Sequence, residues 1–268
     1  MIKVNRELCT QCGLCASVCP AKVLSLPKPD GPIAVRGEFC NRCGHCVAIC
    51  PQGALDHAMA PLAKQSEINP SLAISSEQAA FFLRSRRSTR CYKQEPVARE
   101  LVMKLLDMAR LAPTASNSQN IAYLVIEQRE VLNKAVEVIV QWMEEQVKTG
   151  LFHKSFPLHI SAWRERQEDT ILRQAPQIIL ATAPQEFAKG RENTISAFSY
   201  LELFAPALGL GSCWAGILEM CLLADYGPLL ALFSIPAGQR ATGAVMIGYP
   251  RYKFKRLPDR NPLKVNFL

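Results

Sequence analysis

The first fifty residues carry a repeated cysteine pattern, and cysteine thiolates are the usual ligands of iron–sulfur clusters. Eight of the eleven cysteines lie there, in two copies of C-x2-C-x2-C-x3-C-P offset by thirty-one residues. Three thiolates spaced in this way, on a tight turn, can reach three irons of one [4Fe–4S] cubane, whereas the fourth points toward a neighbouring site. The repeated cysteines are Cys9, Cys12, Cys15 and Cys19, followed by Cys40, Cys43, Cys46 and Cys50. The spacing therefore predicts two clusters that exchange their fourth ligands.

This exchange gives each cluster ligands from both copies of the repeat. The predicted ligand sets are Cys9, Cys12, Cys15 and Cys50 for one cluster, and Cys40, Cys43, Cys46 and Cys19 for the other. A zinc site usually takes two separated C-x2-C pairs and has no use for a third nearby cysteine. Disulfides would need an oxidising compartment, which nothing in the sequence indicates. Residues 1–60 resemble a two-cluster bacterial ferredoxin, and His45 is interpreted as a surface or packing residue because the cysteines complete both sets.

The composition is that of a globular protein, with 49% hydrophobic and 20% charged residues and a net charge of +8. The positive charge suits anionic ligands, but it is spread along the chain with few interleaved aromatic residues, so we expect no nucleic-acid partner. The longest uncharged stretch lies between Glu202 and Glu219 and is too short and too rich in Gly and Pro to span a membrane. We expect no membrane association and a cytoplasmic location.

The remaining chain is long enough for a second domain. We predict a cluster domain over 1–60, a linker over 61–76, where Pro, Ser and charged residues mix without periodicity, and a larger domain over 77–268. Hydrophobic spacing in the larger domain predicts helices over 77–86, 97–111, 131–147 and 192–208, and strands over 120–127, 177–183 and 241–248. Long helices with few strands indicate an α+β fold, with a helix-rich α/β layer as the alternative.

Three segments of the larger domain carry groups that could bind an anionic heterocycle. The first is R-R-S-T-R at 86–90, where arginines offer bidentate donors to phosphate. The second, at 112–120, gathers hydroxyl and amide groups between a helix and a strand. The third, G-L-G-S-C-W-A-G at 209–216, is a turn whose backbone amides can approach a ligand closely, but it lacks the G-x-G-x-x-G spacing of a Rossmann site. Taken singly, each segment also fits an ordinary surface loop.

In this order, the three segments resemble those of the nitroreductase family of FMN enzymes. In that family an R-R-S-x-R run binds the flavin phosphate, and an A-P-[ST]-x-x-N-x-Q loop reaches the flavin bound mainly by the other subunit. A backbone amide of the third segment faces flavin N5, and a basic tail after Gly-Tyr-Pro returns to the phosphate. The resemblance covers 77–268 and implies the FMN-binding residues Arg86, Arg87, Ser88, Arg90, Pro113, Thr114, Ser116, Asn117, Gln119, Ala215, Gly216, Arg256 and Arg260.

The resemblance implies a ferredoxin-like domain with two [4Fe–4S] clusters followed by a nitroreductase-like α+β FMN domain. It also implies a homodimer with the flavin at the subunit interface, and the apolar stretch 196–208 is expected in the core or in that interface. The predicted activity is that of an iron–sulfur flavoprotein oxidoreductase. It would pass electrons from the clusters to FMN and on to a small-molecule acceptor, such as a nitroaromatic, a quinone or a similar conjugated compound. A low-potential donor such as ferredoxin is expected, which makes direct reaction with NAD(P)H less necessary.

Two other functions stay open at this point. The same scaffold could carry another flavin activity, namely enone reduction, dehalogenation or flavin breakdown. Alternatively, the chain could be a two-centre electron-transfer protein that delivers electrons to a protein partner. The sequence does not indicate a catalytic side-chain acid, and residues 151–173 match no motif of the family.

The remaining conspicuous side chains are interpreted as structural. In the unmatched region, His153, His159, Trp163 and Arg164 are interpreted as packing or surface residues. The three cysteines outside the repeat, Cys91, Cys213 and Cys221, are interpreted as small apolar fillers, with Cys213 close enough to touch a flavin.

Overall fold

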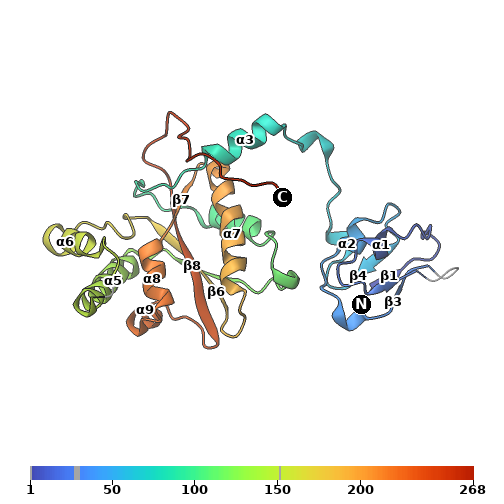
Figure 1. Cartoon of the computed structure of the whole chain (residues 1–268), viewed down its shortest axis with the longest axis horizontal. Helices are drawn as coiled ribbons and strands as arrows, with labels where there is room; N and C mark the ends of the chain where they lie inside the picture. Colours follow the sequence, from blue (N-terminus) through green and yellow to red (C-terminus); the bar gives the residue numbers. More distant parts are fainter. Residues whose placement is uncertain (1, 27–30, 151) are drawn as a thin grey trace. The chain divides into compact units, whose positions relative to one another are not determined.

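The computed structural model describes residues 2–26, 31–150 and 152–268, which form two compact units (Figure 1). Unit 1 comprises Met1–Ile74 together with Ala115–Ser118, and unit 2 comprises Ser75–Thr114 and Gln119–Leu268. Each unit has a hydrophobic core of its own.

Unit 1 consists of short elements that follow the cysteine repeat. Its elements are the strands β1 (Ile2–Val4), β2 (Leu24–Ser25), β3 (Ile33–Ala34) and β4 (Leu55–His57), the helices α1 (Leu14–Ser17) and α2 (His45–Ala48), and 3-10 turns at Gly37–Phe39, Leu62–Lys64 and Pro70–Leu72. Strands β1 and β4 pair antiparallel, as do β2 and β3. Helices α1 and α2 follow Gly13 and Gly44, whose φ angles of 79° and 74° are left-handed. Because glycine adopts this conformation without strain, both copies of the repeat turn in the same way.

The core of unit 1 is small. It consists of Val23, Leu24, Val47, Ala54 and Leu55, joined by Cys15 and Cys19 of the repeat. Two predicted cluster ligands therefore belong to the core itself.

Unit 2 is built on a four-stranded antiparallel sheet in the order β5-β6-β8-β7. Its strands are β5 (Ala122–Ile126), β6 (Gln177–Pro184), β7 (Gly211–Trp214) and β8 (Gln239–Gly248). Its helices are α3 (Ser76–Ser85), α4 (Arg99–Ala109), α5 (Arg129–Thr149), α6 (Phe156–Arg166), α7 (Gly190–Phe204), α8 (Gly216–Leu223) and α9 (Gly227–Leu232), with a 3-10 turn at Ala205–Leu208. A further 3-10 turn, Ala115–Asn117, lies in the segment grouped with unit 1.

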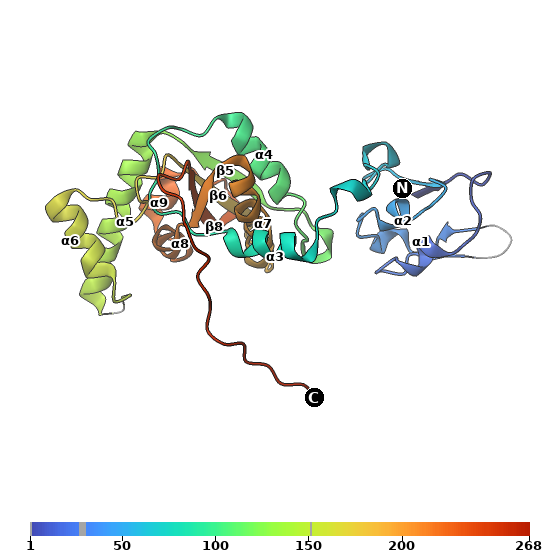
Figure 2. The same cartoon turned by 90° about the horizontal axis from the view of Figure 1, so that it is seen from above.

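Both faces of the central strands are covered by helices, so β6 and β8 are apolar at nearly every position. On β6, Ile178 and Leu180 face the core formed with α5, α8 and α9, whereas Ile179 and Ala181 face the core formed with α4 and α7. Figure 1 and Figure 2 both show α5, α8 and α9 on one side of the strands and α7 on the other. This alternation explains why the sequence shows continuous apolar runs there rather than a one-sided pattern.

The prediction of an α+β fold is confirmed. The four predicted helices and three predicted strands are present, with ends shifted by a few residues, and α7 ends at Phe204 because the chain tightens into a 3-10 turn that contains Pro206. Strand β7, which pairs with β8, was expected only as a glycine-rich turn. Helices α6, α8 and α9 were not predicted. The interpretation of Cys91 as a buried filler is wrong, because its side chain is exposed, whereas Cys213 and Cys221 are buried.

Candidate functional site

Unit 1 contains two hollows, each lined by four cysteines of the repeat. The cysteines of one hollow are Cys9, Cys12, Cys15 and Cys50. The cysteines of the other are Cys19, Cys40, Cys43 and Cys46. We call them hollow I and hollow II. The structure thus brings together the two sets of four that the spacing predicted, each with three residues from one copy and one from the other.

The chemistry of these sulfurs fits a polynuclear cluster. Burial, together with the neighbouring Cys43 and Cys40, raises the pKa of the Cys46 thiol to about 11. Burial likewise raises the pKa of Cys15. Thiolates gathered in this way are stable only beside compensating positive charge, which iron ions supply. Among the described residues no three His, Cys, Asp or Glu side chains converge on a point for a single ion, and a cubane instead binds each thiolate to a different iron.

Backbone amides donate to the sulfurs in the same way in both copies. The Ala54 N–H lies 3.3 Å from Cys50 Sγ, and the Val23 N–H lies 3.4 Å from Cys19 Sγ. The two amides are thirty-one residues apart, as are the two cysteines. Such N–H···S bonds stabilise thiolate ligands and tune the potential of an iron–sulfur cluster.

In unit 2, the segment 88–93 is fixed between β7 and the chain that follows β8. Ser88 forms a parallel bridge with Ser212 of β7, and the Thr89 N–H donates to the Ser212 carbonyl over 2.9 Å. Farther along, Tyr92 bridges Pro250. Gly211 permits this approach, because a Cβ at that position would lie 2.7 Å from Thr89 Cβ. The R-R-S-T-R segment is therefore held along the sheet rather than on a loose loop.

Polar groups gather around this segment. The Ser212 hydroxyl donates to Glu202 over 3.0 Å, and the Arg86 guanidinium lies 3.8 Å from the same buried carboxylate. Within the described part of the chain, Arg87 Nε and Tyr92 OH are buried with no hydrogen-bond partner. Burial, with nearby Cys213 and Glu202, raises the pKa of Tyr92 well above its usual range, so its hydroxyl keeps its proton. A buried donor without a partner fits a site that receives an acceptor such as a phosphate oxygen.

A hollow lies directly against this segment. Its lining consists of Ser88, Thr89, Arg90, Cys91, Tyr252, Lys253 and Phe254. The Arg87 guanidinium stacks on the Phe254 ring, 5.6 Å from its centroid. Two of the predicted residues, Ser88 and Arg90, thus line a hollow with cationic walls, and Arg87 contacts the Phe254 ring in its lining. The sequence reasoning missed Tyr92 and Lys253; the basic run R-Y-K-F-K-R at 251–256 was its only signal for Lys253.

The other predicted FMN residues lie elsewhere. Arg256 and Arg260 are exposed and do not line this hollow. In the second segment, Ser116, Asn117 and Gln119 have φ angles near 50°, a conformation that costs free energy in residues other than glycine.

Residues 115–118 are grouped with unit 1, where Asn117 Nδ2 donates to the Asn41 carbonyl over 3.0 Å. Pro113 is exposed, and the Thr114 hydroxyl accepts from the Gln119 N–H. The structure therefore groups residues 115–118 with unit 1, whereas Arg86–Arg90 belong to unit 2.

The two predicted backbone amides differ in their hydrogen bonding. The Ala215 N–H already donates to the Ala244 carbonyl over 2.9 Å. Gly216 is the exposed first residue of α8, and the first N–H groups of a helix have no partner within the helix. Of the pair, Gly216 is the one placed to donate to a ligand.

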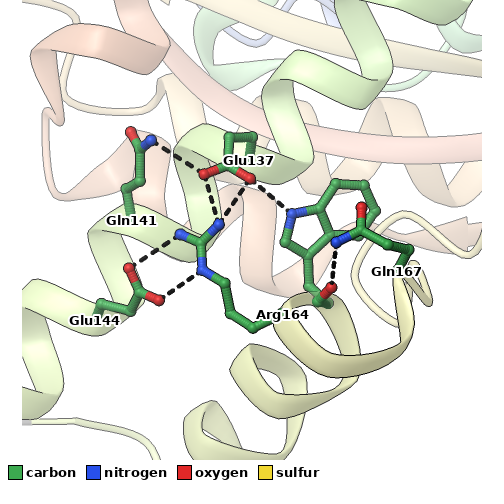
Figure 3. A network of polar contacts seen from close by, with 6 residues as sticks. Glu137, Gln141, Glu144, Arg164 and Gln167 are labelled. Carbon is green, nitrogen blue, oxygen red and sulfur yellow. Dashed lines mark hydrogen bonds and ion pairs between the residues drawn. The ribbon is translucent and has the colours of Figure 1, made fainter.

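The region without a sequence motif forms a polar network between α5 and α6 (Figure 3). Arg164 donates to Glu137 over 2.7 Å and to Glu144 over 2.8 Å, and the Trp163 indole N–H donates to Glu137 over 2.7 Å. His159 hydrogen-bonds Thr170 over 2.7 Å. As predicted, Trp163 and His159 are packing residues here, and Arg164 fastens α6 to α5.

Comparison with known proteins identifies the two parts of the chain. Residues 83–249 match the Nitroreductase family, and residues 8–55 match the 4Fe-4S dicluster domain. The chain belongs to the nitroreductase family. An NADH dehydrogenase of Thermus thermophilus is 28% identical over 65% of this chain and 88% of its own length. An iodotyrosine deiodinase of Thermotoga neapolitana is 24% identical over 69% of this chain and 94% of its own.

Solved structures share the fold of unit 2. An FMN-bound nitroreductase from Desulfitobacterium hafniense superposes with a TM-score of 0.57 at 16% identity, covering 72% of this chain and all of that one. The nitroreductase assignment confirms the predicted enzyme class, an FMN-dependent oxidoreductase. The dicluster match confirms the prediction of two [4Fe–4S] clusters as cofactors beside FMN. No helix in the described ranges is long and apolar enough to cross a membrane.

Proposed function

We propose that this chain is an iron–sulfur flavoprotein that passes electrons from two [4Fe–4S] clusters in unit 1 to FMN in unit 2 and on to a small conjugated acceptor. A nitroaromatic or a quinone is the acceptor class we favour. The proposal rests on one observation above all: a single chain carries two four-cysteine hollows and, in unit 2, which carries the nitroreductase domain, a hollow lined by Arg90 and Lys253. A carrier of single electrons and a site for a cofactor that pairs them complement each other.

We assign the clusters to the hollows. Hollow I would hold one cluster through Cys9, Cys12, Cys15 and Cys50, and hollow II the other through Cys19, Cys40, Cys43 and Cys46. The amides of Ala54 and Val23 would each stabilise the ligand that comes from the opposite copy of the repeat.

We assign the flavin phosphate to the hollow beside Arg86–Arg90. Arg86, Ser88 and Arg90 would bind the phosphate, with Lys253 as an added cation from the tail. Tyr92, whose hydroxyl is buried and unpartnered within the described chain, lines a neighbouring hollow that shares Arg90 with this one. Glu202 holds Arg86 and the Ser212 hydroxyl in place. The Gly216 amide would donate to N5 of the flavin ring.

FMN, when bound, accepts electrons one at a time and delivers them in pairs. The protein's own part is to fix the cofactor and to keep an acceptor beside it. No side-chain acid is assigned, so the protons for the acceptor would come from water or from the reduced flavin.

We further propose that the chain acts as a homodimer with the flavin at the subunit interface. Helix α3 has no buried residue in the single chain, and Phe81 and Leu83 are 63% and 57% exposed. The tail beyond 250 is also exposed, with Leu263 88% and Phe267 92% accessible. Exposed apolar surface of this extent is typical of chains that pack against another subunit.

The test is a cofactor analysis of protein purified without oxygen, followed by assays with acceptors. Two cubanes and one flavin predict about eight irons and one FMN per chain. A reduced low-potential ferredoxin should then support the reduction of a nitroaromatic or quinone. A chain with zinc in place of iron, or a chain that binds no flavin, would contradict the proposal.

A second activity deserves a direct comparison. The similarity to an iodotyrosine deiodinase supports reductive dehalogenation on the same scaffold. A substrate panel that includes a halogenated phenol, an enone, a quinone and a nitroaromatic, with product analysis, separates these activities. The NADH dehydrogenase relative makes NADH the competing donor. Flavin reduction by NADH alone, as fast as reduction through the clusters, would remove the need for a ferredoxin.

A further inference from the structure

The two copies of the cysteine repeat differ at several equivalent positions inside the hollows, and one of these pairs sets a leucine against a buried histidine. Thirty-one residues separate Leu26 from His57, as they separate the cysteines. Leu26 lines hollow I, and His57 lines hollow II. An apolar side chain therefore suffices at this position in one copy, whereas the other copy buries an imidazole.

Both ring nitrogens of His57 have defined neighbours. The side chain is 1% exposed at the end of β4. The Met59 N–H donates to His57 Nδ1 over 3.1 Å, so Nδ1 acts as the acceptor. In a neutral imidazole the proton then lies on Nε2. That nitrogen is 3.7 Å from Cys40 Sγ, so Nε2–H points its proton at the sulfur.

This contact adds to the hydrogen bonds that the sulfur receives from the backbone. The Arg42 N–H also donates to Cys40 Sγ, over 3.4 Å. The hydrogen bonds from the backbone N–H groups of Val23 and Ala54 to cysteine sulfur are equivalent in the two copies, so they cannot make the two hollows differ. His57 can make the hollows differ, because its counterpart Leu26 has no N–H in its side chain.

We propose that His57 is a tuning residue for the cluster of hollow II, whose N–H bond to Cys40 makes that cluster the easier of the two to reduce. The inference rests on the proposed cluster assignment. Reduction adds one electron, taken from a low-potential one-electron donor, and breaks no bond. The added negative charge is shared by the sulfur ligands, so a donor to one of them stabilises the reduced form more than the oxidised form. The electron then resides mainly on the cluster in hollow II.

The test is a redox titration of the full iron-loaded chain, followed by EPR. The leucine variant His57→Leu gives this position of hollow II the side chain found in hollow I and leaves all eight cysteines in place. We expect the equilibrium constant for reduction of the higher-potential cluster to fall about tenfold. This corresponds to a reduction potential that is lower by about 59 mV for one electron. An unchanged potential at full iron content would overturn the role of His57, whereas a wild-type chain without clusters would overturn the proposed function instead.

A second measurement starts from the wild-type chain, in which all cluster ligands and His57 are unchanged. Pulsed EPR of the reduced chain labelled with ¹⁵N-histidine should show a nitrogen coupling. His45→Gln is the matched control, because His45 is exposed in the same repeat. The coupling should persist in His45→Gln and disappear in His57→Gln. A coupling that is absent from the wild-type chain, or that follows His45, would contradict the proposal.

Discussion

The candidate site residues of unit 1 include members of its hydrophobic core, whereas the Arg86–Arg90 segment of unit 2 lies outside its hydrophobic clusters. In unit 1 the candidate ligands Cys15 and Cys19 belong to a core that otherwise consists of Val23, Leu24, Val47, Ala54 and Leu55. In unit 2 the Arg86–Arg90 segment lies along the edge of a sheet that two large apolar clusters already support. A core as small as that of unit 1 does not stabilise a fold of this length without cross-links or metal. The comparison indicates that cofactor binding and folding are one process in unit 1 and two separate processes in unit 2.

The largest effect should come from removing iron. We expect a chelator, applied under reducing conditions, to unfold unit 1 and to leave unit 2 folded. Limited proteolysis with mass spectrometry measures this as loss of the peptides before Ser75 while a fragment of unit 2 persists. The iron-loaded chain treated with the same protease is the control. If unit 1 stays as protected without iron as with it, the contrast between the two units is wrong.

The next effect concerns the phosphate site. Arg90→Ala should weaken FMN binding by about ten- to a hundredfold, because a hydrogen bond to a charged group contributes about 1.5–3 kcal/mol. Riboflavin, which lacks the phosphate, should bind equally to the wild type and the variant. Arg84→Ala, which removes an exposed arginine of α3, is the matched control. Fluorescence titration measures both ligands with all three proteins, and an equal loss of affinity for FMN and riboflavin in Arg90→Ala would show that Arg90 does not bind the phosphate.

A smaller effect on stability should follow from adding a side chain at Gly211, where the segment 88–93 contacts β7. In Gly211→Ala the new Cβ would lie 2.7 Å from Thr89 Cβ, so the segment must move. We expect a loss of about 1–3 kcal/mol in the stability of unit 2, as for overpacking in a core. Gly227→Ala is the control, because nothing lies within 4 Å of that position. Thermal unfolding checks both, and an equal melting temperature for the two variants would show that the approach is not tight.

The smallest effect concerns the network between α5 and α6 (Figure 3). Burial would raise the pKa of Glu137, but hydrogen bonds from Trp163 and Arg164 outweigh it and lower the pKa below 4.5. A carboxyl with a lowered pKa stabilises the fold above its ordinary pKa and loses this contribution as the pH falls. Because Glu137 and Arg164 are both 36% exposed, Glu137→Gln should cost no more than about 1 kcal/mol at pH 7. The difference in melting temperature between Glu137→Gln and the wild type should become smaller below pH 4. A difference that does not change with pH would show that the variant loses packing contacts rather than a charge interaction.

The sequence predicted the two sites unequally, for a physical reason. Three ligands of each cluster lie close together in the chain and the repeat indicates the fourth, so the cysteine pattern alone selects the two sets of four that line the hollows. The phosphate hollow instead joins Arg90 to Lys253, far apart in the sequence, through the antiparallel order of the sheet. No local pattern indicates that pairing, and Tyr92 reads as an ordinary core aromatic until its unpartnered hydroxyl is seen.

The same distinction explains the errors in the predicted elements. Strand β7 was expected as a turn because Gly211 is a poor strand former, yet the residue is needed there to admit Thr89. The short helices α8 and α9 lie in an apolar stretch without helical periodicity, because α8 packs on α5, α9 and β8 through one face while Met220 and Leu223, which are exposed, are apolar too. His57 resembles a surface residue in the sequence and lies 3.7 Å from a candidate ligand only after β1 and β4 have paired.

The most direct test of the account is the rate at which the flavin is reduced in chains with and without clusters. A reduced low-potential ferredoxin is mixed without oxygen with the iron-loaded chain and, separately, with the iron-depleted chain that retains FMN. The account predicts that in the loaded chain the clusters are reduced first and the flavin absorbance then falls, and that the depleted chain is reduced far more slowly. Equal flavin reduction without the clusters, or reduced clusters beside a flavin that stays oxidised, would contradict it.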